Sequence, residues 1–168
     1  ELFAAEIERG LGIDANPEML AVARAALDRA GIGHDSVRTG DIYALGLPRD
    51  AYDAVIIHQV LHFLDDDARA IREAARVLRP GGRLVVVDFA PHEQEFLRES
   101  QQHRRLGFAR ETVEGWMEAA GLEPCQFRTL APEGPRSGKL TVSIWVGRDP
   151  RIITDAPASP VAAAVEVA

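Results

Sequence analysis

The chain has 168 residues, of which 46% are hydrophobic and 27% are charged, and its formal net charge is -7. This length and composition predict one globular domain, and the acidic balance argues against nucleic-acid or anionic-membrane binding by this chain alone. Cys125 is the single cysteine, which excludes an internal disulfide and a cysteine-based zinc cluster. Because no apolar run is long enough to cross a bilayer and cysteine is scarce, we expect a cytoplasmic location.

Hydrophobic periodicity predicts strands and helices that alternate along the chain. The predicted strands cover residues 11–14, 34–39, 52–58, 83–89, 122–130 and 139–146. The predicted helices cover residues 2–9, 17–30, 66–78 and 112–120, and part of the polar stretch 91–105 is expected to be helical. Asn16 and Pro17 suit a helix start, and the segment Arg79-Pro80-Gly81-Gly82 is expected to end a helix sharply.

The order of these elements favours an α/β fold with a doubly wound, mostly parallel sheet. The last two predicted strands would form an antiparallel hairpin at one sheet edge, with residues 131–138 as its turn. Residues 1–148 are expected to form the domain. Residues 149–168 contain much Ala, Pro and Val without a clear period, and we predict that they form a disordered tail or linker.

Polar residues stand where the predicted strands end. Ligands of open α/β sheets bind at the carboxyl ends of the strands, where an acid can hold the two hydroxyls of a ribose. Asp14 has this place, because it ends a strand directly before a helix start. The other residues at predicted strand ends are Gly40, Asp41, His58, Gln59, Asp88, Phe89 and Ala90. Asp14 therefore predicts a nucleoside-bearing cofactor.

Four segments, in this order, resemble class I S-adenosylmethionine-dependent methyltransferases of the small-molecule type (type 11-like): GIDANPEMLAVARAAL, TGDIYALGLP, YDAVIIHQVLHFLDD and EAARVLRPGGRLVVVDF. The region from Trp116 to Val146 is similar to the last helix and hairpin of that family. The resemblance implies a Rossmann-like methyltransferase sheet, S-adenosylmethionine as cofactor and a small-molecule methyl acceptor. The segment VVVDFAPHEQEFLRESQQHRRLGF also resembles methyltransferase domains fused behind arsenic-repressor-type winged-helix regulators of transcription.

The resemblance also implies that one part of the family pattern is missing. The first strand of the family ends in a glycine-rich loop, roughly acid-x-Gly-x-Gly, which contacts the methionine part of the cofactor. Residues 1–9 resemble the helix that follows this loop. We therefore expect an amino-terminally incomplete domain whose first strand, in mid-sheet beside the strand of Asp14, is absent.

The family pattern assigns roles to the residues at the strand ends. The resemblance implies that Asp14 accepts hydrogen bonds from the ribose hydroxyls, and that Asp41 accepts one from the adenine amino group. The other residues implied in cofactor binding are Ala15, Asn16, Gly40, Ile42, His58 and Gln59. The structural alternatives stay open: Asp14 would stabilise the start of the next helix, Asn16 would cap it, and Asp41 would belong to an ordinary loop.

No catalytic residue is assigned by the sequence, and His58, His62 and His92 are the candidates for a general base. His58 and His62 are four residues apart, which suggests a pair on one helical turn. Such a pair suits a metal, but no third ligand is evident, so we predict no metal site. Packing or capping roles for these histidines, and solvent exposure for Glu93 and Glu95, are the alternatives. We expect Trp116, Met117 and Trp145 to pack in the core or at its edge.

The predicted function is S-adenosylmethionine-dependent methyl transfer to a small molecule. The alternative is a non-catalytic module of a transcription regulator that senses S-adenosylmethionine or S-adenosylhomocysteine. A nicotinamide dehydrogenase would share the ribose-binding acid, but the sequence has no visible GxGxxG motif. No motif specifies the methyl acceptor or the oligomeric state.

Overall fold

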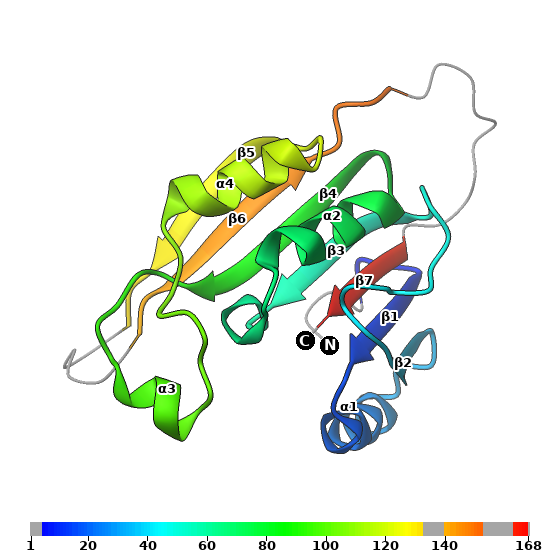
Figure 1. The fold of residues 1–168 in the computed structure, drawn as a ribbon. Helices are drawn as coiled ribbons and strands as arrows, with labels where there is room; N and C mark the ends of the chain where they lie inside the picture. The colour runs from blue at the N-terminus through cyan, green and yellow to red at the C-terminus, as the bar shows by residue number, and fades with distance from the viewer. Residues whose placement is uncertain (1–4, 133–139, 153–162, 168) are drawn as a thin grey trace.

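The computed structural model describes residues 5–132, 140–152 and 163–167. In these residues, one sheet of seven strands has the order β2-β1-β7-β3-β4-β6-β5 (Figure 1). The strands are β1 (Arg9–Asp14), β2 (Asp35–Thr39), β3 (Tyr52–His58), β4 (Leu78–Phe89), β5 (Glu123–Leu130), β6 (Val142–Arg148) and β7 (Ala163–Val167). The helices are α1 (Pro17–Ala30), the 3-10 helix η1 (Leu61–Phe63), α2 (Asp67–Val77), α3 (Phe96–Ser100) and α4 (Arg110–Ala119).

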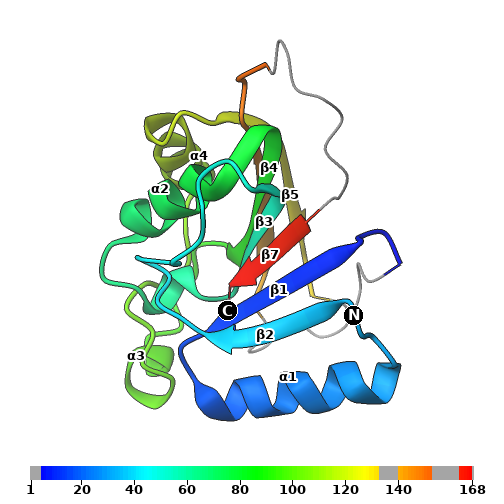
Figure 2. The same cartoon turned by 90° about the vertical axis from the view of Figure 1, so that its right-hand side faces the viewer.

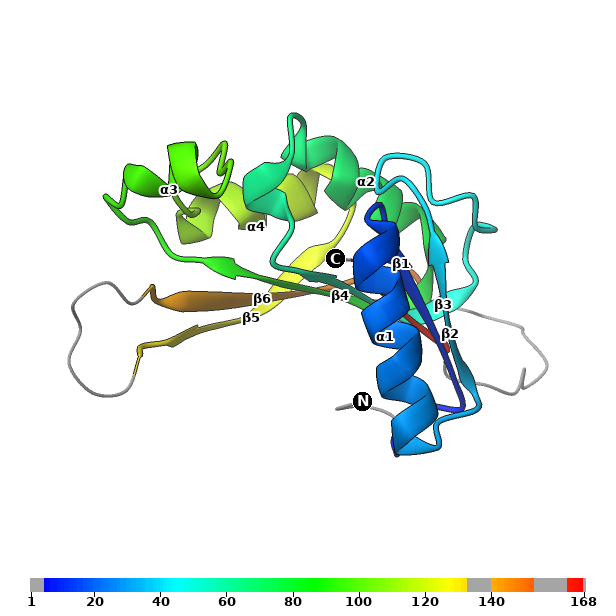
Figure 3. The ribbon, with the colours of Figure 1, turned by 90° about the horizontal axis from the view of Figure 1, so that it is seen from below.

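The sheet is mostly parallel and has helices on both faces, although in the described residues the second face is covered by a helix only at β1 and β2. Strands β2, β1, β7, β3 and β4 run parallel, whereas β6 pairs antiparallel with both β4 and β5. Helices α2 and α4 lie side by side on one face, and α1 packs against β1 and β2 on the other (Figure 3). This arrangement confirms the predicted α/β fold class with a closing antiparallel hairpin, and it shows a Rossmann-like sheet.

Helix α1 shows why the local sequence folds as it does. The Asn16 side chain accepts a hydrogen bond from the Glu18 backbone N–H at 2.8 Å, and Pro17 occupies the first helical position. The helix ends at Gly31, whose φ of 67° is a left-handed conformation that glycine adopts without a steric penalty. Both predicted boundaries of this helix are confirmed.

The core lies between the central strands and α2. Val55, Ile57, Leu84 and Val86 are fully buried and alternate with partly exposed residues along β3 and β4, and α2 contributes Ile71 to the same cluster. The predicted core roles of Met117 and Trp145 are confirmed by their exposure of 0%, and Trp116 packs against the cluster while partly exposed. This core supports the edge of the sheet at which the parallel strands end.

Two predicted boundaries near the start and middle of the chain are wrong. Residues 5–8 form a turn and a bend instead of a helix end, because Gly10 already pairs with the segment of β2 through its N–H to the His34 carbonyl. The segment Arg79-Pro80-Gly81-Gly82 does end α2, but it continues as part of β4. Gly81 has a φ of 78°, and the register with β3 shifts there, so the segment is an irregular part of the strand that two backbone hydrogen bonds join to Asp149.

The predicted disordered tail is corrected by β7. Residues 163–167 form a strand that registers with residues 9–13 of β1 and with residues 54–57 of β3 (Figure 2). This is the mid-sheet position in which we expected no strand. Val suits a strand, whereas Ala does not favour one. The two partner strands are more than 100 residues away in the sequence, where no local pattern reveals them. The boundary of the domain at residue 148 stays a prediction.

The closing hairpin has the predicted partners but a shifted second strand. Strand β6 begins at Val142 and ends at Arg148, compared with the predicted residues 139–146. The register with β4 explains the shift, because Arg148 pairs with Arg83 and Val142 with Phe89. Residues 133–139, which contain most of the predicted turn, lie outside the described residues.

Candidate functional site

Asp14 and Asp41 lie at the edge where parallel strands end. Asp14 is the last residue of β1, is half-buried, and accepts a hydrogen bond on Oδ1 from the Asn16 N–H at 2.7 Å. Asp41 follows β2, is exposed, and accepts a hydrogen bond on Oδ1 from the Tyr43 N–H at 2.8 Å. Among the described residues, neither carboxylate forms an ion pair or a hydrogen bond through Oδ2. Both carboxylates therefore retain hydrogen-bonding capacity at one edge.

Gly40 brings the two strand ends close together. Asp14 registers with Thr39, and the Gly40 N–H donates to the Asp14 carbonyl at 3.2 Å. A Cβ on Gly40 would lie 2.5 Å from Cγ2 of Ile13, so a larger residue would push the strands apart. The adjacency of Asp14 and Asp41 thus depends on this glycine.

The neighbouring predicted residues have mixed roles. Asn16 caps α1, which is the structural alternative that the sequence left open for this residue. Ala15 beside it is exposed. Ile42 is half-buried and packs against the hydrophobic core directly after Asp41. Ala15 and Ile42 are therefore close in sequence to the two acids, while the Asn16 side-chain oxygen is occupied by the cap.

The predicted pairing of His58 with His62 on one helical turn is wrong. His58 is the exposed last residue of β3, and Gln59 has a φ of 54°, which is left-handed. The Gln59 N–H donates to the Val87 carbonyl at 2.8 Å, which keeps the chain bound to β4 as it turns. His62 then falls in η1, on a separate element. A non-glycine residue in this backbone region is strained, and such strain concentrates at functional sites.

The sequence did not reveal the partner of His62, which is Asp88. The side chains are buried, with exposures of 3% and 0%, and His62 Nδ1 lies 2.8 Å from Asp88 Oδ1. The same oxygen accepts the Phe89 N–H at 2.7 Å. An ionised carboxylate only accepts hydrogen bonds, so the imidazole donates from Nδ1 and its Nε2 carries the basic lone pair. This is the geometry of a histidine whose tautomer is fixed by an acid.

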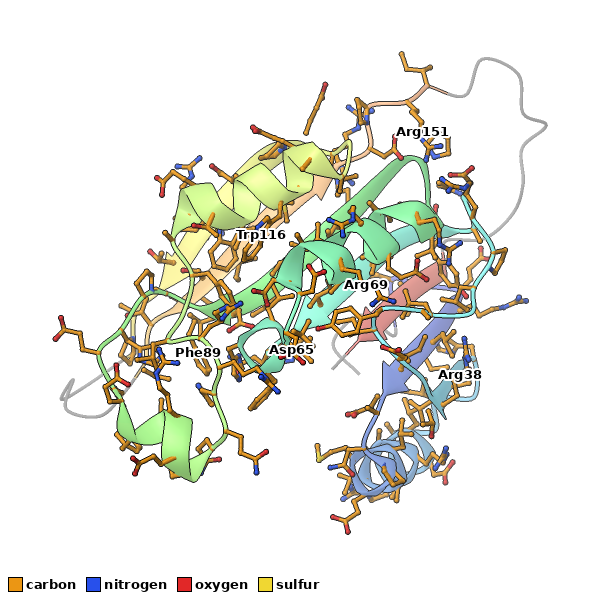
Figure 4. The ribbon with its side chains drawn as sticks, viewed as in Figure 1. Arg38, Asp65, Arg69, Phe89, Trp116 and Arg151 are labelled. Atoms are coloured by element: carbon orange, nitrogen blue, oxygen red, sulfur yellow. The ribbon has the colours of Figure 1, made fainter. Side chains whose placement is uncertain are left out.

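Aromatic rings surround this pair. The ring centroid of His62 lies 4.1 Å from that of Phe63, 5.0 Å from Phe89 and 4.2 Å from His103. The ring centroid of His92 lies 6.1 Å from that of Phe89, in an edge-to-face arrangement. Figure 4 shows Phe89 at the end of β4, near the loop that carries Asp65. The cluster therefore lies at the same sheet edge as the two acids.

Burial favours the neutral form of the two histidines around the pair, His92 and His103. Burial, reinforced by the positive charge that His62 can carry, lowers the pKa of His92 and of His103. Asp88 opposes this lowering in both cases but does not outweigh it. A neutral imidazole both donates and accepts hydrogen bonds, so His92 and His103 suit a polar, uncharged ligand.

Hydrogen bonds and ion pairs hold the segment after α3 against η1 and the start of α2. The His62 carbonyl accepts the Arg104 N–H at 2.8 Å and the Arg105 N–H at 3.2 Å. Arg104 forms an ion pair with Asp65 at 2.7 Å, and Arg105 forms one with the buried Asp67 at 3.3 Å. Burial raises the pKa of Asp67, and the nearby positive charge of Arg105 offsets only part of this rise. These contacts fix His103 against the ring of His62.

A separate groove of about 700 Å³ follows α2 and contains none of the predicted site residues. It is rich in arginine, and its charged lining residues are Arg49, Arg69, Arg72, Glu73, Arg76, Asp149 and Arg151. Most of these are already paired: Arg76 bonds twice to Glu73, and Arg151 bonds to Asp149. Arg69 and Arg151 lie at different positions along the groove (Figure 4).

In the described part of the chain, no group of three or more His, Cys, Asp or Glu side chains is arranged to hold a metal ion. None of the helices in those residues is long and apolar enough to cross a membrane.

A family model described as a methyltransferase domain matches residues 1–86, which is more than half of the chain. The chain belongs to the methyltransferase domain family. An uncharacterized methyltransferase of Mycobacterium bovis is 37% identical over 130 residues, which are 76% of this chain and 46% of that protein. The uncharacterized methyltransferase YcgJ of Bacillus subtilis is 31% identical over 101 residues, which are 60% of this chain and 40% of YcgJ. This methyltransferase domain thus spans less than half the length of both relatives.

Solved structures agree with the fold of the methyltransferase domain. The crystal structure of YcgJ aligns with a TM-score of 0.71 and 19% identity, over 89% of this chain and 86% of that structure. A methyltransferase structure from Bacillus halodurans aligns with a TM-score of 0.75 and 18% identity, with the same two coverages. At these identities the likeness shows the fold.

S-adenosylmethionine is the cofactor of this family, which confirms the cofactor predicted from the sequence. The described residues fit its adenosine part. Asp14 and Asp41 each carry a carboxylate oxygen without a hydrogen bond from the described residues, and Gly40 allows their strand ends to meet. The individual contacts of Asp14, Ala15, Asn16, Gly40, Asp41, Ile42, His58 and Gln59 with the cofactor stay predictions.

Proposed function

We propose that this chain binds S-adenosylmethionine at the Asp14 and Asp41 edge and serves methyl transfer to a small molecule. The observation that supports this most is the adjacency of two acids at neighbouring strand ends, each with an unused oxygen. Asp14 would accept from the two ribose hydroxyls, and Asp41 from the adenine amino group. A cytoplasmic location, suited to the single cysteine, is part of the proposal.

The chemistry requires little from the protein beyond alignment. When bound, S-adenosylmethionine supplies a methyl group activated by its sulfonium. The chain orients the acceptor for in-line attack and excludes water from the reacting groups. A side chain of the protein must remove a proton only where the acceptor carries one. The candidates for this base are His58, His62 and His92. His58 ends β3, and the other two contact residues at the end of β4.

Isothermal titration calorimetry with S-adenosylmethionine and with S-adenosylhomocysteine tests the cofactor site. Asp14→Asn leaves one oxygen that accepts from Asn16 but removes the charge and the second acceptor. Losing one charge-assisted hydrogen bond costs about 1.5–3 kcal/mol, so affinity should fall roughly 10- to 100-fold. Asp28→Asn makes the same change on the exposed side of α1 and should leave affinity unchanged. Equal affinity in the wild type and Asp14→Asn would refute the ribose role.

An amino-terminally extended form of the chain addresses the glycine-rich loop. The family contacts the methionine part of the cofactor with this loop, so we propose that the extended form binds S-adenosylmethionine more tightly. An added first strand would compete with β7 for the position between β1 and β3. Faster amide hydrogen exchange at residues 163–167 in the extended form would show that the added strand displaces β7. Unchanged affinity together with unchanged amide hydrogen exchange would refute this proposal.

A second candidate is a cofactor-sensing module of a transcription regulator. The resemblance of residues 85–108 to regulator-fused methyltransferase domains favours it. Binding of S-adenosylmethionine without methyl transfer to any acceptor would support the sensor, and transfer of a tritiated methyl group to an acceptor would support the enzyme.

A further inference from the structure

Three polar atoms in the cluster around Asp88 are buried and have no hydrogen-bond partner among the described residues. They are Asp88 Oδ2, His92 Nε2 and His103 Nδ1. Asp88 is 0% exposed and His103 is 8% exposed, so water does not reach these side chains freely. A buried polar atom without a partner costs about 1–3 kcal/mol, and native structures contain few of them. Three in one cluster indicate a site built to receive a polar group.

The shape of the cluster indicates what carries this polar group. Phe63 packs directly on His62 and is 43% exposed, so its ring connects the buried imidazole with the surface. Phe63 also meets His103 edge-on, with ring centroids 5.3 Å apart. Aromatic rings prefer to pack edge-to-face or in offset stacks, so a further ring can pack on Phe63. An aromatic compound placed on Phe63 would direct a polar substituent towards His62 and His103.

The charges of the cluster suit a neutral acceptor. Burial lowers the pKa of His92 and of His103, which favours neutral imidazoles, and Asp88 is already paired with His62. A neutral hydroxyl can both donate to one imidazole nitrogen and accept from another. The cluster therefore favours a hydroxyl group over an ammonium group.

We propose that His62, oriented by Asp88, accepts the proton of an aromatic hydroxyl that is the methyl acceptor of this site. This inference rests on the proposed methyltransferase function and names the substrate class. As the hydroxyl oxygen forms its bond to the methyl carbon, the carbon–sulfur bond breaks and its electron pair remains on sulfur as a neutral thioether. The hydroxyl proton passes to His62 Nε2, and the Asp88 carboxylate at 2.8 Å from Nδ1 stabilises the imidazolium.

The position of the pair supports a role in proton transfer. Burial at 3% and 0% exposure strengthens the interaction between imidazolium and carboxylate relative to water. The backbone bonds from Arg104 and Arg105 to the His62 carbonyl hold the imidazole in place without using its Nε2. His58 is exposed at the end of β3, and no buried acid among the described residues pairs with His92, so His62 is the best oriented of the three candidates.

Two probe acceptors separate a base from a structural residue. Catechol carries hydroxyls that stay protonated near neutral pH, whereas thiophenol ionises readily in water and does not require a protein base. The variants are His62→Gln and Asp88→Asn, and His34→Gln at the other end of the sheet is the control. Transfer of a tritiated methyl group from S-adenosylmethionine is measured at saturating cofactor and at pH values from 6 to 9.

The proposal predicts that His62→Gln and Asp88→Asn slow the methylation of catechol roughly 100-fold or more and change that of thiophenol less than about twofold. His34→Gln should match the wild type with both probes. Equal losses with both probes would show a structural role and overturn the proposal, and so would methylation of thiophenol alone by the wild type.

Nuclear magnetic resonance of ¹⁵N-labelled histidine gives a readout that does not depend on activity. The wild type should show His62 protonated at Nδ1, and saturating catechol should shift the resonances of His62 and His103 but not that of His34. Absence of these shifts would overturn the proposal even if the chain binds S-adenosylmethionine. Absence of cofactor binding in calorimetry, with the catechol shifts present, would instead count against the proposed methyltransferase function.

Discussion

Proline at residue 165 tests whether β7 holds the middle of the sheet. Val165 registers with Leu11 of β1 and with Val55 of β3, so its backbone is flanked by a strand on each side. Proline has no N–H and is found in sheets almost only at edges and bulges. Val165→Pro removes one ladder hydrogen bond and leaves its carbonyl partner unpaired between strands. This change should cost about 1–3 kcal/mol.

For a chain of this size, each 1 kcal/mol shifts the melting temperature by about 2–4 °C. Val165→Pro should therefore melt roughly 2–12 °C below Val165→Ala, which shortens the side chain but keeps the N–H. Differential scanning calorimetry measures the difference, and amide exchange at Leu11 and Val55 should accelerate in the proline variant. Equal melting temperatures and unchanged exchange would refute the placement of β7 and would support a disordered tail.

Three further outcomes follow from the site and its surroundings. Asp41→Asn should weaken S-adenosylmethionine binding less than Asp14→Asn does: the remaining oxygen accepts from Tyr43, so one amino donor loses its acceptor, compared with two ribose hydroxyls at Asp14; calorimetry that finds the larger loss at Asp41 would contradict the assignment. Gly107→Ala should lower the melting temperature more than Gly121→Ala: both have positive φ, but only at Gly107 would a Cβ collide with the Ala90 carbonyl oxygen, and equal losses would refute this. The melting temperature should fall as pH decreases below about 6.5, because burial lowers the pKa of His92 and His103, so the unfolded chain binds protons first. His103→Gln should make this decrease less steep, and an equally steep curve for that variant would contradict the burial argument. Asp67 acts at lower pH: its raised pKa contributes stability that is lost as pH rises.

Elements with strong local signals were predicted well. Helix α1 has a capping Asn16, a Pro17 and a terminal Gly31, and each acts through its own neighbours. Strand β3 is a continuous apolar segment between loops, and its predicted range 52–58 is confirmed. In both cases the information lies within the element itself, so no knowledge of the sheet is needed.

Elements defined by distant partners were not predicted. Strand β7 has no period and no turn signal, and it becomes a strand because β1 and β3 leave a pairing position between them. The extension of β4 towards Leu78 likewise depends on Asp149, which bonds to the backbone of Gly82. Such bonds join segments that are remote in the sequence, and a local pattern does not contain them.

The candidate site divides in the same way. The rule that ligands gather at strand ends correctly placed Asp14 and Asp41 at one edge. The contact of His62 with Asp88 was missed, because the residues are 26 positions apart and belong to different elements. The chain before His62 also turns at Gln59 in a left-handed conformation, which the identity of that residue does not indicate.

The sequence position of β7 has a consequence for synthesis. Every other strand of the sheet emerges from the ribosome before residues 163–167 do. Until then, β1 with β2 and β3 with β4, β6 and β5 form two separate pieces, and each exposes an unpaired backbone edge. Such edges invite association with other chains, so we expect the nascent protein to be vulnerable to aggregation until residues 163–167 have emerged and paired.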